Sequence, residues 1–201
     1  MIAIIDYDAG NIKSVEKALI YLGEDVIVTR DKDTILNADK VILPGVGAFG
    51  DAMNRLYEYG LVDVIKASIA SGKPFLGICL GLQLLFEKSE ESPGVSGLGI
   101  FKGKIKKFSE NKGFKIPQIG WNSLKIKDNA RLFDGIADNS YVYFVHSYYL
   151  EAEDEGIVST WTEYADTFHS SIEKGNIFAC QFHPEKSSDT GLKILSNFAK
   201  L

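Results

Sequence analysis

The sequence has few of the residues that cross-link proteins or bind metals. Its 201 residues include only two cysteines, Cys79 and Cys180, and three histidines. Two cysteines are too few for a disulfide framework, so we expect two free thiols, each of which needs its own explanation. Neither cysteine nor histidine occurs at the spacing of a metal site, so we expect no metal and no metal-based chemistry.

An excess of positive charge and a long apolar run are also lacking. Lysine and arginine number 22 against 27 acidic residues, a net charge of −5, which argues against a nucleic-acid partner. The longest apolar stretch, residues 74–86, is interrupted by glycine and Gln83 and is too short to span a bilayer. Residues 1–6 lack the basic region of a signal peptide, so we expect a cytoplasmic protein with no membrane partner.

The composition is typical of a folded chain, with 45% apolar and 24% charged residues. A chain of this length can form one good core without disulfides. The sequence contains no internal repeat, low-complexity tract or long linker. We therefore expect one domain spanning residues 1–201.

The first half alternates short apolar runs with amphipathic segments. This order is typical of parallel strands joined by right-handed helical crossovers. Asn11 is predicted to cap the first helix, which Gly23 ends. Asp51 is predicted to cap a helical stretch that is interrupted at Gly60 and closed at Gly72. The predicted strands are residues 2–5, 26–28, 41–43 and 74–78.

From about Gly97 the pattern becomes rich in β-strand residues, and the strands there are predicted to be antiparallel. A hairpin is predicted through residues 174–176, and residues 189–201 are predicted to close the chain as a helix. We therefore predict an α/β fold with an open, mixed, mainly parallel central sheet flanked by helices and extended by antiparallel strands in the second half. The predicted later strands are residues 99–108, 116–126, 141–150, 157–162 and 177–182.

Cys79 lies where a predicted strand turns into a predicted helix, between Gly77 and Gly81. A nucleophile on a tight strand-to-helix turn needs small neighbours, because the strained backbone leaves no room for side chains. Such a thiol would face the free amides of a helix N-terminus, which favour the thiolate. A small buried apolar residue is the alternative interpretation. The local pattern alone leaves both interpretations open.

A cysteine nucleophile requires an imidazole, and His183 is the strongest candidate. Positions two apart on an extended segment share a side, so Glu185 is predicted to hold the His183 ring. Parallel strands end at a common edge, which would bring Cys79 and His183 together. His146 is predicted to be a hydrogen-bonded residue within or beside the site, and His169 to lie on the surface. Cys180 alternates with aromatic residues and is predicted to be core.

The segment Pro44 to Gly50 has the glycine pattern of a phosphate-binding loop between a strand and a helix. A nucleotide-binding module is therefore one hypothesis. The pattern is weak by itself, because no acidic residue ends the next strand. The same glycines can free backbone amides to hold an anionic oxygen beside a nucleophile, and this second use fits the sequence better.

Taken together, these motifs resemble the class I (triad) glutamine amidotransferases, and among them the glutaminase subunits of imidazole glycerol phosphate synthase. The resemblance covers essentially the whole chain and implies a flavodoxin-like fold of that family. It rests on six segments in order, which are residues 6–11 (Asp-Tyr-Asp-Ala-Gly-Asn), 44–50 (Pro-Gly-Val-Gly-Ala-Phe-Gly), 77–86 (Gly-Ile-Cys-Leu-Gly-Leu-Gln-Leu-Leu-Phe), 120–122 (Gly-Trp-Asn), 143–147 (Tyr-Phe-Val-His-Ser) and 181–186 (Gln-Phe-His-Pro-Glu-Lys).

The resemblance implies roles for individual residues. Cys79 would be the nucleophile, His183 the general acid and base, and Glu185 the residue that orients His183. The backbone amides of Val46 and Leu80 would form an oxyanion hole, and the loop that carries Val46 is expected to rearrange when partner and ligand bind. The glutamine pocket would be lined by Gly47, Gln83, Glu91, His146 and Ser147.

The resemblance also implies a partner and no cofactor. Ammonia released from glutamine would go to a cyclase subunit with a β/α-barrel fold, forming a heterodimer in histidine biosynthesis. Trp121, Asn122, Tyr143 and Lys186 would lie on the docking face, although strand packing and solvation explain each residue singly. The alternatives are a glutaminase subunit of another biosynthetic amidotransferase, a nucleotide-binding α/β module that uses Gly45 to Gly50, and a cysteine hydrolase that acts alone.

Overall fold

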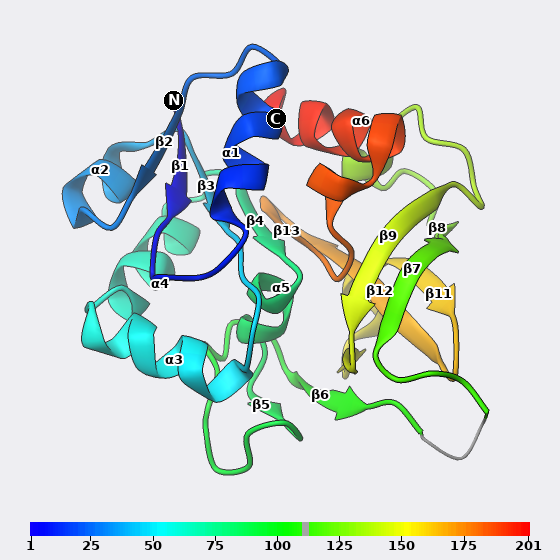
Figure 1. Cartoon of the computed structure of the whole chain (residues 1–201). Helices are drawn as coiled ribbons and strands as arrows, with labels where there is room; N and C mark the ends of the chain where they lie inside the picture. The colour runs from blue at the N-terminus through cyan, green and yellow to red at the C-terminus, as the bar shows by residue number, and fades with distance from the viewer. Residues whose placement is uncertain (110–112) are drawn as a thin grey trace.

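In the computed structural model, which describes residues 1–109 and 113–201, a long twisted sheet forms the centre of the molecule (Figure 1). Its first part is parallel and has the strand order β2-β1-β3-β4-β13. These strands are short and apolar, and β1, β4 and most of β3 and β13 are buried, as expected for a parallel sheet that is covered on both faces. Their bounds are Ile2–Ile5 (β1), Val26–Thr29 (β2), Lys40–Leu43 (β3), Phe75–Ile78 (β4) and Ile177–Cys180 (β13).

The sheet continues beyond β13 with the order β12-β10-β6-β5, in which β12 and β10 run antiparallel to their neighbours. Strand β11 pairs with β12 and with β8, and β7 and β9 form a separate antiparallel pair. The bounds are Lys88–Ser89 (β5), Gly103–Lys107 (β6), Gln118–Ser123 (β7), Lys125–Ile126 (β8), Tyr141–His146 (β9), Tyr148–Ala152 (β10), Val158–Glu163 (β11) and Thr167–Lys174 (β12).

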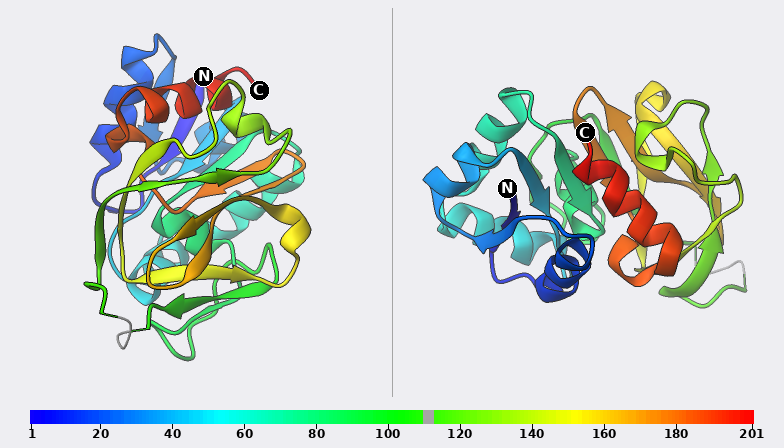
Figure 2. Two further views of the ribbon diagram at one scale, coloured as in Figure 1. Left: turned by 90° about the vertical axis from the view of Figure 1, so that its right-hand side faces the viewer. Right: turned by 90° about the horizontal axis from the view of Figure 1, so that it is seen from above.

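Helices cover both faces of the parallel part, as the views in Figure 2 show. Residues of α2, α3, α4 and α5 contribute to the hydrophobic cluster on one face, and α1, α6 and β9 contribute to the cluster on the other. The bounds are Ile12–Tyr21 (α1), Lys32–Asn37 (α2), Phe49–Glu58 (α3), Val62–Ala70 (α4), Leu80–Leu84 (α5) and Ser188–Ala199 (α6), with 3₁₀ turns at Arg131–Phe133 (η2), Glu155–Ile157 (η3) and Pro184–Lys186 (η4).

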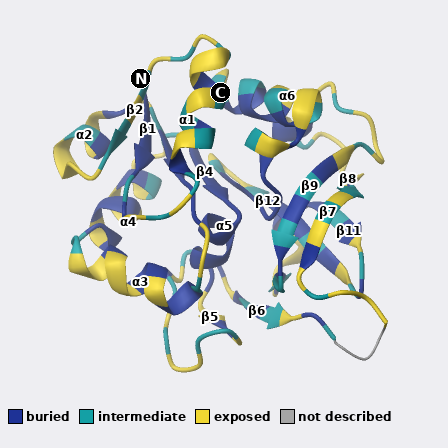
Figure 3. Cartoon of the chain, in the orientation of Figure 1, coloured by how far each residue is buried: buried dark blue, intermediate teal, exposed yellow. Residues whose placement is uncertain are grey.

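The central strands divide their side chains between the two clusters. In β3, Val41 and Leu43 belong to one cluster and Ile42 to the other, and in β4 Phe75 and Leu76 divide in the same way. Figure 3 shows the buried strands between helices whose outer surfaces are exposed. The predicted α/β class, with a mainly parallel sheet and additional antiparallel strands, is confirmed.

The helices differ from prediction at three places. The stretch predicted to begin at Asp51 begins earlier, because Ala48 rather than Asp51 is the N-cap of α3. Its predicted interruption at Gly60 is confirmed, since α3 ends at Glu58 and α4 begins at Val62. The short helix α2 was not predicted, since it has a single buried side chain, Ile35, and therefore no apolar period. Asn11 occupies the N-cap position of α1, but its side chain makes no capping hydrogen bond.

The strands of the second half are shorter than predicted. Residues 141–150 form two strands, because the chain bends at Ser147 and passes from the small sheet, in β9, to the central sheet, in β10. The predicted strand 177–182 ends at Cys180, and the amide of His183 instead donates to the carbonyl of Tyr143 in β9. The predicted hairpin into β13 is confirmed, although β13 also pairs in parallel with β4.

The carboxyl ends of the parallel strands meet at one edge of the sheet. The segments that follow β1, β3, β4 and β13 there begin at Asp6, Pro44, Cys79 and Gln181. Open α/β sheets bind ligands at this edge, because the loops after the strands converge there. Within residues 1–109 and 113–201, no helix is both long enough and apolar enough to cross a membrane.

Candidate functional site

Cys79 occupies a strained turn between β4 and α5. Its φ and ψ angles are 55° and −108°, a left-handed φ that a residue with a side chain rarely adopts. The glycines on either side are required by packing, since a Cβ atom on Gly77 would lie 2.8 Å from the carbonyl oxygen of Gly81, and one on Gly81 would collide with the carbonyl of Leu43. The turn has the geometry of a nucleophile elbow, as predicted.

Side chains, rather than helix amides, surround the thiol. Nε2 of Gln181 donates to Sγ of Cys79 at 3.6 Å, and His183 lines the same cavity as the thiol. Nε2 of Gln83 in turn donates to Oε1 of Gln181 at 3.0 Å. This bond directs the amide NH₂ group of Gln181 toward the sulfur. The expected helix N-terminus contributes little, because α5 is only five residues long and the Leu80 amide donates to the carbonyl of Gly45 at 3.2 Å.

His183 is paired with Glu185. Nδ1 of His183 donates to Oε1 of Glu185 at 2.8 Å, and the two side chains are 3% and 0% exposed. The predicted pairing is therefore present, but Glu185 lies in the 3₁₀ turn η4 and not on an extended segment. Burial by itself lowers the pKa of His183, yet the hydrogen bonds to Cys79 and Glu185, together with their charges, outweigh burial and raise the pKa to about 10.

The backbone of His183 is fixed by β9. The amide of His183 donates to the Tyr143 carbonyl at 2.9 Å, and Oγ of Ser187 donates to the His183 carbonyl at 2.6 Å. The same Ser187 oxygen accepts from the Tyr143 amide at 2.9 Å. These bonds hold the segment after β13 against the small sheet and so place the imidazole beside the thiol of Cys79.

A cavity of about 350 Å³ opens beside the thiol. It brings together Cys79 and His183 with all five residues predicted to line a substrate pocket, and it adds Pro117, Val145 and Tyr148, which were not predicted as site residues. A larger depression of about 670 Å³ beside η2 and the C-terminal residues contains no cysteine or histidine. The smaller cavity is lined by Val46, Gly47, Cys79, Leu80, Gln83, Glu91, Pro117, Val145, His146, Ser147, Tyr148, His183 and Lys186.

His146 lines the cavity as a fixed polar group. Its Nδ1 donates to the Tyr148 carbonyl at 2.8 Å, and its Nε2 lies 3.0 Å from Oε1 of Gln118. Burial is the main cause that lowers the pKa of His146 to about 4; the Tyr148 carbonyl opposes it, and the charge of His183 adds to it. His146 is thus neutral at pH 7. His169 is half-buried rather than on the surface, and it accepts a hydrogen bond from the Ala152 amide.

The glycine-rich loop is unsuited to a phosphate. The Phe49 amide at the start of α3 donates to the carboxylate of Glu91 at 2.8 Å, and the Gly50 amide donates to Ser92 at 2.9 Å. These are the amides that a phosphate-binding loop leaves free for the ligand, and a carboxylate beside them repels an anion. The nucleotide-binding hypothesis is therefore disfavoured.

The four residues predicted to form a docking face are divided by the structure. Trp121 and Tyr143 are partners across β7 and β9, with ring centroids 6.0 Å apart, on the outer face of the small sheet. Asn122 lies on the opposite face, where its amine donates to the Glu163 carbonyl. Lys186 is exposed and lines the cavity that contains Cys79.

Two polar residues beside the candidate triad were missed by sequence reasoning. Gln181 is fully buried and donates to Cys79, and Asn11 donates to Oε1 of Glu185 at 2.5 Å. A buried glutamine at the end of an apolar strand is a signal that could have been used, because buried polar groups need partners. Asn11 ends one of the segments that carry the family resemblance, but nothing in its local pattern points to Glu185, which is 174 positions away.

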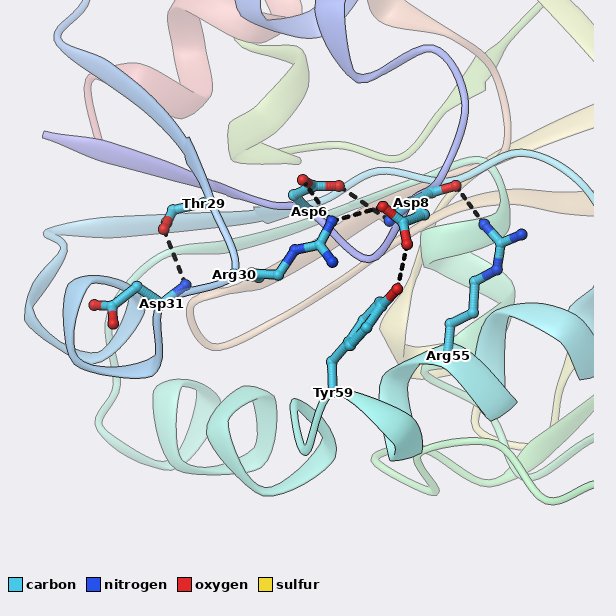
Figure 4. A network of polar contacts seen from close by, with 7 residues as sticks. All are labelled: Asp6, Asp8, Thr29, Arg30, Asp31, Arg55 and Tyr59. Atoms are coloured by element: carbon cyan, nitrogen blue, oxygen red, sulfur yellow. Dashed lines mark hydrogen bonds and ion pairs between the residues drawn. The ribbon is translucent and has the colours of Figure 1, made fainter.

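A charged network supports the loop after β1, from which Asn11 comes (Figure 4). Arg30 donates to Asp6 at 3.0 Å and to Asp8 at 2.6 Å, and Tyr59 donates to Asp8. The hydrogen bonds from Tyr59 and then Arg30 lower the pKa of Asp8. Arg55 donates to the backbone carbonyl of Asp8, which anchors the loop to α3.

A family model described as glutamine amidotransferase class-I matches residues 3–201 of this chain. The chain belongs to the class I glutamine amidotransferases. Among its relatives in this family, a protein from Caldanaerobacter subterraneus subsp. tengcongensis is 53% identical over all of this chain and 98% of its own length. One from Methanocaldococcus jannaschii is 51% identical over the full length of both chains. Both are called imidazole glycerol phosphate synthase subunit HisH.

Solved structures of distant amidotransferases share the fold. A crystal structure called glutamine amidotransferase aligns over 99% of both chains with a TM-score of 0.76 at 20% identity. The structure of PurLQS from Thermotoga maritima aligns over 99% of this chain and 97% of that chain with a TM-score of 0.74 at 21% identity. At this level of identity the likeness concerns the fold alone.

Proposed function

We propose that this chain is the glutaminase subunit of imidazole glycerol phosphate synthase, which hydrolyses glutamine and passes ammonia to a cyclase partner in histidine biosynthesis. The observation that carries the proposal is a single cavity lined by both Cys79 and His183, with the His183 ring held by Glu185. The names of relatives that are about half identical over the full length support the choice among amidotransferases. The proposed role is cytoplasmic, where a reducing environment keeps the nucleophile as a thiol.

In the proposed reaction, the thiolate of Cys79 attacks the side-chain amide carbon of glutamine and a tetrahedral oxyanion forms. Protonated His183 gives its proton to the amide nitrogen, the carbon–nitrogen bond breaks, and ammonia leaves a thioester on Cys79. His183 then takes a proton from water, and the hydroxide attacks the thioester. Glutamate departs and the sulfur is free again. Glu185 holds the ring so that Nε2 faces the sulfur throughout.

The proposed pocket has polar groups for the two ends of glutamine. Glu91 uses Oε2 to accept from the Phe49 amide, and its side chain also lines the cavity. Gln83 and Gly47 also line the cavity, as do His146 and Ser147 at the end of β9. A carboxylate at one end suits the α-ammonium group of the substrate.

The proposed oxyanion hole consists of the amides of Val46 and Leu80. In the present conformation the Leu80 amide donates to the Gly45 carbonyl at 3.2 Å, so this donor is occupied. If the peptide between Gly45 and Val46 turned over, it would free the Leu80 amide and direct the Val46 amide into the cavity. Each such donor is typically worth about 3 kcal/mol of transition-state stabilisation. We therefore propose that partner and ligand binding drive this rotation.

Free ammonia becomes ammonium in water and loses its nucleophilicity, so the proposal requires a docked acceptor. We propose a β/α-barrel cyclase that converts a phosphoribulosyl-formimino carboxamide ribotide to imidazole glycerol phosphate. It would bind the outer face of the small sheet, where Ile119, Trp121 and Tyr141 are 63%, 53% and 59% exposed. An apolar patch of this kind, beside the cavity, suits a protein partner. Lys186 would lie at the rim between cavity and partner.

The decisive experiment compares Cys79→Ala with Cys180→Ala in the assembled complex. Both substitutions remove a buried thiol, but Cys180 lies in the core and its sulfur contacts the Phe182 carbonyl. We expect Cys79→Ala to abolish synthesis from glutamine while synthesis from added ammonium salts continues. Cys180→Ala should retain both activities. Loss of the ammonium-dependent reaction in Cys79→Ala would argue against an ammonia-donor role.

A second experiment tests the oxyanion rotation and the need for a partner. The glutaminase rate of the isolated chain is compared with that of the complex carrying the cyclase ligand. We expect a much lower rate in isolation, because one proposed donor is occupied. Equal rates would contradict the rotation, and activity of the isolated chain on other amides would instead favour a hydrolase that acts alone.

A further inference from the structure

Asn11 lies at the start of α1, but its side chain does not cap that helix. It occupies the N-cap position with a φ of 68°, and its side chain makes no capping hydrogen bond. Asparagine is among the best capping residues, and omitting the cap leaves a helix less stable by about 1 kcal/mol. The amide side chain is directed instead across the edge of the sheet to η4, where Nδ2 donates to Oε1 of Glu185 at 2.5 Å.

Glu185 has few other restraints. Its side chain is fully buried, and Oε1 accepts from both His183 and Asn11. Among the described residues, Oε2 has no hydrogen-bond partner. A carboxylate that is held through one oxygen can rotate about its terminal torsion, which is broad. Two donors in different directions at the same oxygen fix the orientation of the carboxylate, and one of them is Asn11.

We propose that Asn11 is a positioning residue for the reaction, which holds Glu185 so that the carboxylate keeps the His183 ring directed at Cys79. This inference rests on the proposed function of the triad. A neutral amide is suited to this task, since it orients the carboxylate without neutralising the charge that His183 needs. A lysine or arginine at this position would compete with His183 for Glu185.

The loop that carries Asn11 is rigid enough for this role. Asp8 is fixed by Arg30, Tyr59 and Arg55 at one end of the loop, and the Tyr7 hydroxyl donates to the Pro44 carbonyl at 2.8 Å. The left-handed backbone of Asn11 favours asparagine or glycine over other residues. Asparagine at position 11 thus tolerates the left-handed backbone of this loop and also supplies a hydrogen-bond donor for Glu185.

The test uses Asn11→Gly, which removes the donor but tolerates the left-handed φ. The matched control is Asn139→Gly, because Asn139 also has a left-handed φ, of 64°, and its side-chain amide donates to the exposed carboxylate of Asp138. Both variants are assayed as complexes with the cyclase partner. We expect Asn11→Gly to lower the glutamine-dependent kcat about tenfold, as the loss of one hydrogen bond to a charged group predicts. The KM for glutamine should change less than twofold, because Asn11 does not line the cavity.

A second variant removes the hydrogen-bond donor of the Asn11 side chain while keeping the volume of that side chain. Asn11→Asp has nearly the same shape but, when ionised, cannot donate to Glu185 and repels it. We expect it to lower kcat at least as much as Asn11→Gly does at pH 7. Synthesis from ammonium salts should remain at the wild-type level in both variants, because that reaction takes place on the cyclase. A binding titration with the cyclase, at an affinity within about twofold of wild type, establishes that both variants fold and dock.

Three results would overturn the positioning role. They are a kcat for Asn11→Gly within twofold of that for Asn139→Gly, a loss that appears only in KM, and an Asn11→Asp variant as active as wild type. The proposed function fails in a different way, since the unaltered complex would then release no ammonia from glutamine. The two failures are therefore distinguishable.

Discussion

The catalytic edge of the central sheet and the outer face of the small sheet carry opposite kinds of surface. At the edge, polar side chains are buried and bonded to one another, as in the chain from Gln83 through Gln181 to Cys79. On the small sheet, large apolar side chains are exposed, with Ile119 at 63% and Tyr141 at 59%. The buried polar groups at the edge find partners within one chain, whereas the outer face of β7 and β9 leaves apolar surface in water. The first is suited to chemistry and the second to a partner.

The two regions share a strand. Tyr143 has its ring on the outer face beside Trp121, while its carbonyl accepts from the His183 amide and its amide donates to Ser187. Any shift of β9 on docking therefore reaches the backbone of His183 through two hydrogen bonds. The comparison predicts that substitutions at the edge change chemistry and spare docking, and that substitutions on the outer face do the reverse.

The largest effect is expected at the edge. His183→Ala removes the proposed acid and base, and the glutaminase rate should fall by about 10³-fold, within the range for general acid–base catalysis. Affinity for the cyclase should stay within about twofold of wild type, because His183 is 2% exposed and does not reach the outer face. Steady-state ammonia release and a binding titration measure the two quantities. A large loss of affinity with an intact rate would reverse the proposed division.

The next effect is expected on the outer face. Trp121→Ala should weaken cyclase binding about 30-fold, which corresponds to about 2 kcal/mol for an aromatic anchor. Tyr141→Ala should weaken it less. The control is Tyr57→Ala, since Tyr57 on α3 is 57% exposed against 59% for Tyr141 but lies away from the small sheet. If Tyr57→Ala weakened binding as much as Tyr141→Ala, another face would be the docking site.

The smallest effect is expected in the pH dependence of the free energy of unfolding, to which His183 at the catalytic edge contributes. The pKa of His183 is raised from 6.5 to about 10 by its bonds to Cys79 and Glu185, against the opposing effect of burial. A histidine whose pKa is raised on folding stabilises the protein fully below its unfolded pKa, and this contribution is lost as pH rises through the folded value. The free energy of unfolding should therefore fall between pH 6.5 and about 10.

The control for that measurement is Cys79→Ala, which removes one of the two partners that raise the pKa of His183. Urea unfolding at several pH values should give a shallower fall for this variant than for wild type. Trp121→Ala, on the outer face, should follow the wild-type curve. Parallel curves for Cys79→Ala and wild type would mean that the thiol does not raise the pKa of His183.

Much of the fold could be predicted because it depends on local pattern. The short apolar runs of the first half predicted the parallel strands, and the glycines beside Cys79 predicted the elbow. The division of residues 141–150 at Ser147 could not be predicted, since both halves are equally apolar and only their different partner strands separate them. Helix α2 has too few buried side chains to leave a period.

The candidate site was predicted in part for the same reason. Residues that match a motif, such as His183 and Glu185, were correctly predicted to pair. The reason given was wrong, because the two side chains are brought together by a 3₁₀ turn and not by an extended segment. Asn11 was predicted to cap a helix, because capping is the local use of asparagine. Its bond to Glu185 depends on two loops that are adjacent only because β1, β3, β4 and β13 lie in one sheet.

By itself, the sequence determined the strand-to-helix turn at Cys79, the buried strands around it and the family to which the chain belongs. These follow from side-chain size, apolar period and short motifs, which act over a few residues. Tertiary structure decided which donors surround the thiol, that the Leu80 amide is occupied by Gly45, and that Asn11 contacts Glu185. Such contacts join residues far apart in the chain, and their hydrogen bonds form only where packing of the sheet brings the strand ends together.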